Sequence, residues 1–268
     1  MLNAAGTPIT VESQSAVNAP DQVALHSYGT SFATRWVTVH DTAVDGSAPF
    51  NANTAAKAKH ATPFKRPENG AFRPGSHFGE FFFTETGDTN ATSTENDTAG
   101  GWGSLFKLTQ SDPSASTGKI SVFFKGSVGV TGLDNLTFLS KGQLAAVEDA
   151  GDTLHSQRNA LDSGFAFDLG TDYSAAGAKP VRWLAEGRDA PATIDSASGG
   201  FGKNDGDNEI TGAVVANGDP GPDGILGAKS PNLGDSKWRW FYTQQHGDNF
   251  TYEVLVGSRG DHGDGHDD

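Results

Sequence analysis

Acidic side chains recur at comparable points of this chain, each at the start or the end of a short apolar segment. Glu68, Asp134 and Glu209 open such segments, whereas Glu85 and Glu148 close the segments that follow the first two. If these segments are strands arranged about one axis, the carboxylates converge, and converging carboxylates repel one another unless a cation neutralises them. Oxygen ligands without thiolate favour Ca²⁺, Mg²⁺ or Mn²⁺, so the recurrence predicts a shared metal site. For any single acid, a turn cap or a solvated side chain is an equally good explanation.

Arg66 and Glu68 stand two positions apart, on either side of a proline. On an extended segment, side chains at positions i and i+2 share a face, so a guanidinium lies beside a carboxylate. The carboxylate is suited to hold a metal ion while the guanidinium binds a phosphate through two parallel hydrogen bonds. The spacing alone agrees equally well with a structural Arg–Glu pair.

The composition excludes several classes of function. The chain of 268 residues has 33 Asp and Glu against 19 Lys and Arg, a formal net charge of −14. This balance argues against a nucleic-acid partner and against an anionic membrane surface, which both attract basic faces. Cysteine is absent, which excludes disulfides, thiolate zinc sites and a thiol nucleophile. The sequence contains no apolar run of about eighteen residues, so no membrane-spanning helix is expected, and its first residues lack the pattern of a signal peptide.

Most apolar segments are short, rich in aromatic or β-branched residues, and bounded by Gly, Asp, Asn or Pro. This pattern predicts strands joined by turns. Residues 51–59 are short, Ala-rich and the best candidate for a helix. The clearest strand candidates are residues 35–40, 78–84, 104–108, 120–124 and 238–243.

The predicted strands fall into a repeat whose units start near positions 68, 134 and 209. A repeated unit of four short strands is typical of a β-propeller blade. We therefore expect an all-β fold, a β-propeller of about three four-stranded blades, with a partial blade from residues 23–26 and 35–41. A β-sandwich with coincidental spacing is the alternative. Residues 1–257 would form the partial propeller, with an acidic insert at 218–235, and 258–268 a disordered tail rich in Asp and His.

Three units and a fragment leave a propeller open, since closed propellers have about 4–8 blades. An open arc exposes sheet faces and strand edges. We therefore expect another chain, supplying an N-terminal half, or self-association to complete the ring.

Several segments resemble, in order, motifs of the alkaline phosphatase PhoX family of bacterial secreted proteins. The most specific is residues 61–70 (ATPFKRPENG), with its Arg-Pro-Glu run. The resemblance extends from about residue 20 to residue 257. The other segments are 83–88 (FTETGD), 100–103 (GGWG), 133–136 (LDNL), 147–149 (VED), 208–212 (NEITG) and 241–244 (FYTQ).

The resemblance implies a six-bladed propeller that hydrolyses phosphate monoesters at a calcium and iron cluster in its funnel, in an extracellular or periplasmic protein. In that family the arginine of the Arg-Pro-Glu run contacts phosphate and the glutamate binds metal, which assigns these catalytic roles to Arg66 and Glu68. Glu148 and Glu209 match later acidic positions and are expected as further ligands. The recurrence described above adds Asp134 and Glu85 to the expected metal ligands.

The chain resembles only the C-terminal half of the family. The N-terminal half supplies a Thr-Pro-Trp-Gly-type motif and, in one branch, a cysteine that binds iron, and neither occurs here. Calcium is therefore the expected cofactor, and iron is the less favoured one.

Two other functions fit the sequence. A non-catalytic, calcium-binding propeller fragment would act in assembly or binding, because unpaired blades invite association. A sugar-binding propeller would use exposed Trp102, Trp183, Trp238 and Trp240, although at least two of these are expected in the core.

Overall fold

The computed structural model describes residues 20–87, 97–150, 160–186, 209–218, 231–235, 237–245 and 249–255. Within these ranges the chain is all-β apart from three short helices, and its strands form three antiparallel sheets. The helices are α1 (Pro20–Leu25), α2 (Thr42–Asp45) and α3 (Ala52–Ala58). None of the described helices is long and apolar enough to cross a membrane.

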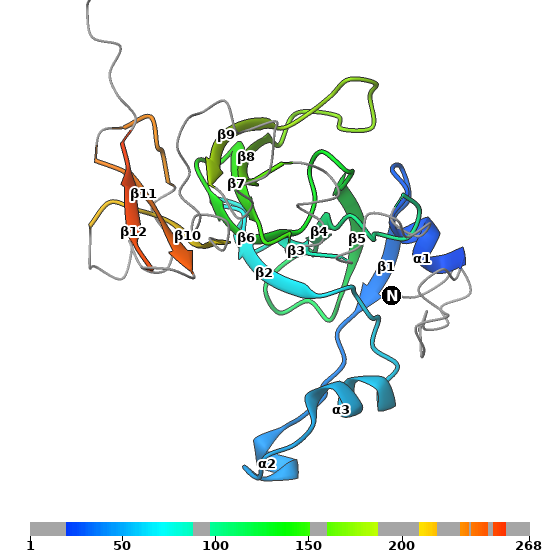
Figure 1. Ribbon diagram of the computed structural model, residues 1–268. Helices are drawn as coiled ribbons and strands as arrows, with labels where there is room; N and C mark the ends of the chain where they lie inside the picture. Colours follow the sequence, from blue (N-terminus) through cyan, green and yellow to red (C-terminus); the bar gives the residue numbers. More distant parts are fainter. Residues whose placement is uncertain are drawn as a thin grey trace, which may run out of the picture.

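Strands β2–β5, β6–β9 and β10–β12 each form a meander of consecutive strands, and β1 joins the first sheet beside β5 (Figure 1). The first sheet has the order β1-β5-β4-β3-β2, the second β6-β7-β8-β9 and the third β10-β11-β12. The first contains β1 (Phe32–Arg35), β2 (Pro67–Phe72), β3 (Glu80–Glu85), β4 (Ser104–Thr109) and β5 (Thr117–Lys125). The second contains β6 (Leu133–Phe138), β7 (Gln143–Glu148), β8 (Asp162–Asp168) and β9 (Val181–Glu186), and the third β10 (Glu209–Ala216), β11 (Arg239–Gln245) and β12 (Thr251–Val254).

The three units expected from the sequence are confirmed, since a run of consecutive paired strands begins near each predicted start, at β2, β6 and β10. The first strands of successive sheets, β2, β6 and β10, lie next to one another along the row. Consecutive antiparallel strands that fan outward from adjacent first strands are the arrangement of propeller blades. The predicted helix is also present as α3, capped by the side chain of Asn51, which accepts a hydrogen bond from Thr54 N.

The residues expected to form a partial fourth blade have a different structure. Residues 20–25 form α1, which places proline at the first helical position and buries Gln22 and Leu25. Only Arg35 of residues 35–41 belongs to a strand, and that strand, β1, pairs with β5 at the outer edge of the first sheet. The third sheet has three strands in the described residues, and most of the insert at 218–235 and all of the tail lie outside them.

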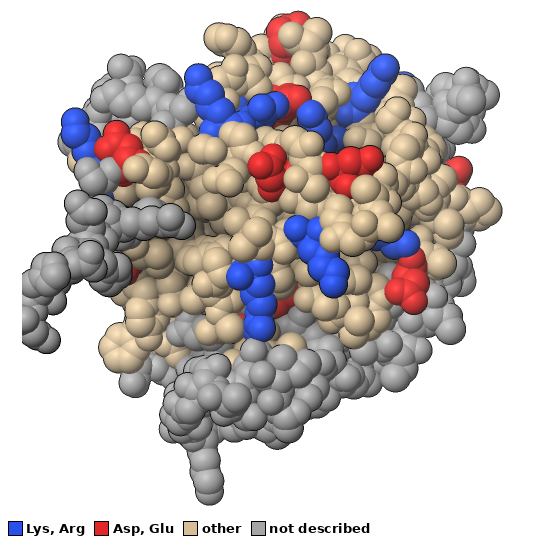
Figure 2. All heavy atoms as spheres, turned by 90° about the horizontal axis from the view of Figure 1, so that it is seen from above, with Lys and Arg blue, Asp and Glu red and all other residues tan. Residues whose placement is uncertain are grey.

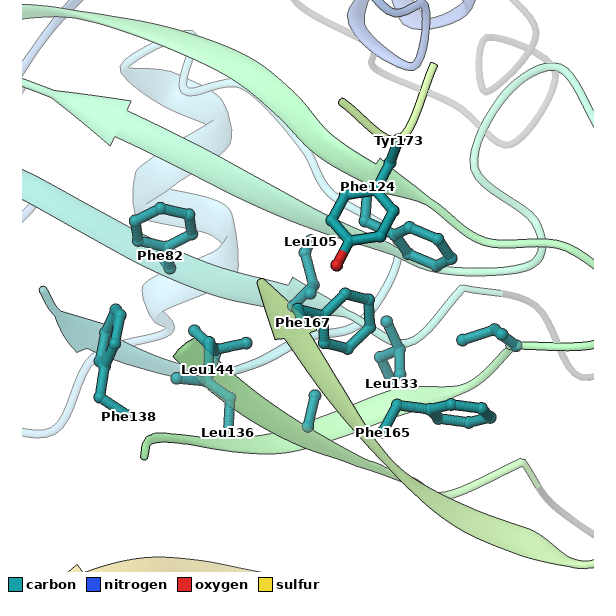
Figure 3. Close-up of a cluster of buried hydrophobic side chains, with 12 residues drawn as sticks. Phe82, Leu105, Phe124, Leu133, Leu136, Phe138, Leu144, Phe165, Phe167 and Tyr173 are labelled. Carbon is teal, nitrogen blue, oxygen red and sulfur yellow. The ribbon is translucent and has the colours of Figure 1, made fainter. Parts of the chain in front are cut away.

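Apolar side chains pack between neighbouring sheets because successive residues of a strand point to opposite faces. On β3, Phe82 points toward the second sheet, whereas Phe81 and Phe83 point to the other face of the first sheet, toward the cluster with Leu25 of α1. Figure 3 shows the cluster between the first two sheets. Its largest members are Phe82, Leu105 and Phe124 of the first sheet and Leu133, Phe138, Leu144, Phe165, Phe167 and Tyr173 from the second sheet and the loop after β8.

Two asparagines join the first strands of neighbouring sheets. Asn69 Oδ1 accepts a hydrogen bond from Leu136 N, 3.4 Å away. Asn135 Oδ1 accepts from Gly212 N at 2.6 Å and from Thr211 Oγ1 at 2.9 Å. Each of the three first strands departs from regular register close to these contacts. A β-bulge re-aims a side chain, and here it accompanies amides that link the sheets.

Replacing Asn135 by alanine should lower the free energy of unfolding by about 0.5–1.5 kcal/mol, because the partly buried Thr211 Oγ1 and the exposed Gly212 N both lose their acceptor. Chemical denaturation of the whole chain measures this loss. Asn53→Ala, on the exposed surface of α3, is the control and should change stability by no more than about 0.5 kcal/mol. Equal losses in the two variants would contradict the linking role.

Candidate functional site

Arg66 occupies an unusual backbone conformation where the chain enters β2. Its φ is 56°, a value that is uncommon for residues other than glycine. Two hydrogen bonds hold this turn against the end of β3: Thr86 N donates to Arg66 O, and Gly87 N donates to Lys65 O, both at 3.0 Å. Strain held by the surrounding structure is often found at functional sites.

The Arg66 side chain lies between two carboxylates, Glu68 and Asp149. Its Nη2 is 3.3 Å from Asp149 Oδ2, and its Nε is 3.9 Å from Glu68 Oε1. The side chains of Arg66 and Glu68 are 41% and 39% exposed, whereas that of Asp149 is 18% exposed. We call these three residues the Arg66 cluster. It joins the start of the first sheet to the end of β7 in the second.

The Arg66 cluster is suited to binding an oxyanion. A guanidinium has five N–H donors in a fixed fork, and the contacts with Glu68 and Asp149 involve only Nε and Nη2. The two carboxylates orient the fork, and their own oxygens are hard ligands of the kind that calcium and magnesium prefer.

Glu85, which the sequence predicts as a metal ligand, is fully buried at the end of β3. Its Oε2 is 2.6 Å from Nε2 of the equally buried His26, and its Oε1 accepts a hydrogen bond from Lys65 N at 2.6 Å. His26 Nδ1 lies 2.8 Å from Gln22 O, which only accepts, so Nδ1 carries a hydrogen.

Gly100 makes room for the His26–Glu85 pair. Its φ is 78°, and a Cβ on this residue would come 2.1 Å from His26 Nε2 and 2.8 Å from Glu85 Oε2. The expected GGWG motif therefore contributes its first glycine to the packing around a buried carboxylate.

Glu148 has the corresponding position in the second sheet. It is fully buried at the end of β7, and its Oε1 accepts from Thr131 N at 2.8 Å. Lys65 lies two residues before the start of β2, and Thr131 lies two residues before the start of β6. Gln245, which pairs in register with Glu209, has the same place in the third sheet. The recurring strand-end acids thus accept hydrogen bonds from the backbone that leads into β2 and β6.

The structure brings only some of the predicted residues together. Glu68 lies in the Arg66 cluster, while Asp134 is half-buried in β6, and its carbonyl oxygen accepts from Thr84 Oγ1 at 2.5 Å. Glu209 opens β10, but its side chain lies outside the described residues. Among the side chains that the structure describes, no three of His, Asp or Glu come close enough to hold a metal ion. Metal binding by Glu68, Glu85, Asp134, Glu148 and Glu209 stays a prediction.

Sequence reasoning did not identify His26 and gave Asp149 no role of its own. His26 and Glu85 are 59 positions apart, and no spacing rule connects a helix before the repeat with a strand inside it. Asp149 carried a signal, because it follows Glu148 directly at a recurring strand end. Its contact with Arg66 depends on how the first two sheets pack.

A second charged group lies at the other end of β3. Glu80 Oε1 is 2.5 Å from Lys107 Nζ, and Glu80 Oε2 is 2.7 Å from Arg73 Nη1. Partial burial alone would raise the pKa of Glu80, but the hydrogen bonds from Lys107 and Arg73 outweigh it and hold this pKa below its ordinary value. Figure 2 shows basic and acidic side chains intermingled on one face, so the acidic balance of the sequence does not gather into a single patch among the residues coloured there.

Substitutions of Glu85 distinguish a side chain that anchors the backbone from one that binds a metal ion, because the two roles predict different losses of stability. Glu85→Gln should lower the free energy of unfolding by only about 1 kcal/mol, because an amide can accept from Lys65 N and donate to His26 Nε2. Glu85→Leu should cost about 3 kcal/mol or more, since neither the partly buried Lys65 N nor the buried His26 Nε2 can bond to an apolar side chain. Thermal and urea unfolding measure the two variants. If both lost stability equally, and only in the presence of calcium, the anchoring role would be wrong.

Comparison with known proteins gives one significant structural similarity. No protein-family model and no curated protein sequence matches the chain. Among solved structures, it is similar to Pseudomonas fluorescens PhoX in complex with vanadate, a transition state analogue, with 16% sequence identity and a TM-score of 0.43. The aligned region covers 73% of this chain and 31% of that chain, so this chain spans about a third of the length of that protein.

Proposed function

We propose that this chain takes part in the hydrolysis of phosphate monoesters, with the Arg66 cluster as the phosphate-binding element. The observation that carries the proposal is the guanidinium of Arg66, partly exposed and flanked by Glu68 and Asp149 at the junction of two sheets. The resemblance of residues 61–70 to the Arg-Pro-Glu motif of PhoX phosphatases supports it. The proposal includes the extracellular or periplasmic location that this resemblance implies.

In the proposed reaction, water adds to phosphorus, the ester P–O bond breaks, and the alcohol leaves with a proton. Arg66 would bind two phosphate oxygens and stabilise the negative charge on the transferring group, which is the main contribution of a protein to phosphoryl transfer. Asp149 and Glu68 would keep the guanidinium in one orientation, so that its donors are in place before the substrate binds.

Calcium is part of the proposal, with Glu68 and Asp149 as its candidate ligands. Their carboxylates are the right kind of donor, but calcium takes about six to eight oxygens, so further ligands would have to come from elsewhere. When bound, the ion would polarise a phosphate oxygen. Glu85 and Glu148 are less suited to this role, because each accepts a backbone hydrogen bond while fully buried.

Arg66→Lys should lower kcat/KM for 4-nitrophenyl phosphate on the order of 100-fold, because lysine keeps the charge but loses the fork. Release of 4-nitrophenol measures this. Arg73→Lys is the matched control, since Arg73 pairs with Glu80 at the opposite end of β2, and should leave the rate unchanged. A wild-type chain that is folded but inactive with calcium, or equal rates for wild type and Arg66→Lys, would overturn the proposal.

Removal of calcium should abolish the activity. A chelator such as EGTA should stop the release of phosphate, and added CaCl₂ should restore it, whereas Glu68→Gln should need more calcium for half-maximal activity. The calcium dependence of the rate in wild type and variant measures this. Activity that is insensitive to the chelator would remove calcium from the proposal and leave the role of Arg66 intact.

The alternative, a non-catalytic assembly module, is favoured by exposed apolar side chains of the third sheet. Val214, Phe250, Tyr252 and Leu255 are 38–59% exposed there. Phe250, Tyr252 and Leu255 lie on or next to β12, the strand at the outer edge of this sheet in the described residues, and such an edge invites pairing with another chain. The sugar-binding function loses support, because Trp102 and Trp240 are buried and Trp183 packs on Trp240 with ring centroids 4.2 Å apart.

The assembly function predicts association through the third sheet. Sedimentation of wild type should show a dimer or a complex with a second chain, and Tyr252→Asp should shift it to a monomer. Lys119→Asp, on β5 of the first sheet, is a control that should not change the sedimentation coefficient. A monomer at all concentrations would count against assembly by self-association.

A further inference from the structure

A cavity of about 480 Å³ lies beside Glu68, on the face of the first sheet that points away from the second sheet. Its floor is apolar and consists of Phe81, Phe83, Leu108 and Ile120. Its other wall belongs to the segment between β1 and β2, which we call the arm (residues 36–64). Figure 1 shows that α2 and α3 of the arm project away from the sheets.

The arm contributes both apolar and polar groups to the cavity. Trp36 and Val39 follow β1, and Ala56 and Ala61 come from α3 and the chain after it. Lys59 and His60 also line the cavity. Cavities of about 300–1,000 Å³ that are mainly apolar, with a few polar groups, are typical of small-molecule sites.

Glu68 connects this cavity with the Arg66 cluster. The stretch Pro67–Gly70, where β2 departs from regular register, lines the cavity, and Glu68 belongs to this stretch. A Cβ on Gly70 would lie 2.3 Å from Phe81 Cζ, so the Phe81 ring lies directly against the Gly70 backbone. The motif that carries Arg66 and Glu68 therefore also shapes the cavity floor.

We propose that the cavity binds the apolar organic group of a phosphate monoester whose phosphate lies at Arg66. This inference rests on the proposed function, and it names the substrate class as aryl or longer alkyl monoesters. Glu68 lies in both places, because it lines the cavity and is 3.9 Å from Arg66 Nε. The floor offers the faces and edges of Phe81 and Phe83, which suit an aromatic ring or an alkyl chain.

The inference predicts that the rate depends on the apolar group of the substrate. The kcat/KM should increase roughly threefold to fourfold per methylene from ethyl to hexyl phosphate, because each buried methylene contributes about the same transfer free energy. Ala56→Phe, which fills part of the cavity, should flatten this dependence. Ala58→Phe, on the same helix but outside the cavity lining, is the matched control and should keep the dependence of wild type.

A second measurement separates the cavity from the reaction. Calorimetry should detect binding of 4-butylphenol, the alcohol of an aryl monoester, to wild type and to Ala58→Phe, and roughly tenfold weaker binding to Ala56→Phe. Ala61→Leu offers a second way to fill the cavity if Ala56→Phe does not fold, and should weaken binding in the same direction.

The outcomes separate this inference from the proposed function. Binding of 4-butylphenol that is sensitive to Ala56→Phe, in a chain without phosphatase activity, would overturn the proposed function and confirm the cavity as an apolar ligand site. An active enzyme with no dependence on chain length, and equal 4-butylphenol binding by wild type and Ala56→Phe, would overturn the inference alone. A wild-type dimer that Ala56→Phe converts to a monomer would also overturn it, because a second copy would then fill the cavity.

Discussion

The geometry of the first two sheets depends on one buried carboxylate in each, at the end of β3 in the first sheet and at the end of β7 in the second. Burying a carboxylate without partners is very costly, so Glu85 and Glu148 need hydrogen-bond donors close by. Lys65 N and Thr131 N supply them, each two residues before a first strand. This requirement fixes where β2 and β6 begin. The turn at Arg66 is held by two further bonds, from Thr86 N to Arg66 O and from Gly87 N to Lys65 O.

The sheets are then held in a row by side chains as well as by apolar packing. β2, β6 and β10 do not pair with one another through backbone hydrogen bonds. Asn69 and Asn135 provide polar links between them, at points where each strand's pairing within its own sheet is irregular. An amide oxygen that accepts a backbone N–H sets the relative height of two strands, which apolar contacts alone leave undetermined. The contact between Arg66 of one sheet and Asp149 of the next depends on that height.

The repeat could be predicted from the sequence because aromatic and β-branched residues mark the strands and because acids recur at their ends. The role of those acids could not, since a carboxylate satisfied by backbone N–H groups has the same sequence pattern as one that binds a cation. The segment before the repeat was also misread: residues 23–26 are apolar enough for a strand, but Pro20 and the burial of Leu25 favour α1. The His26–Glu85 pair depends on that helix, so no local pattern could reveal it.

Charge connects the two main parts of the proposed function. The Arg66 cluster combines one positive and two negative side chains, and a phosphate monoester brings further negative charge to it. The carboxylates that orient the guanidinium therefore also repel the substrate, unless a cation lies among them. In the proposed function, binding of phosphate at Arg66 and binding of calcium by Glu68 and Asp149 would support each other: the cation would offset the repulsion, and the phosphate would supply oxygens that the two carboxylates cannot. An oxyanion site that contains two acids is consistent with catalysis only in this coupled form.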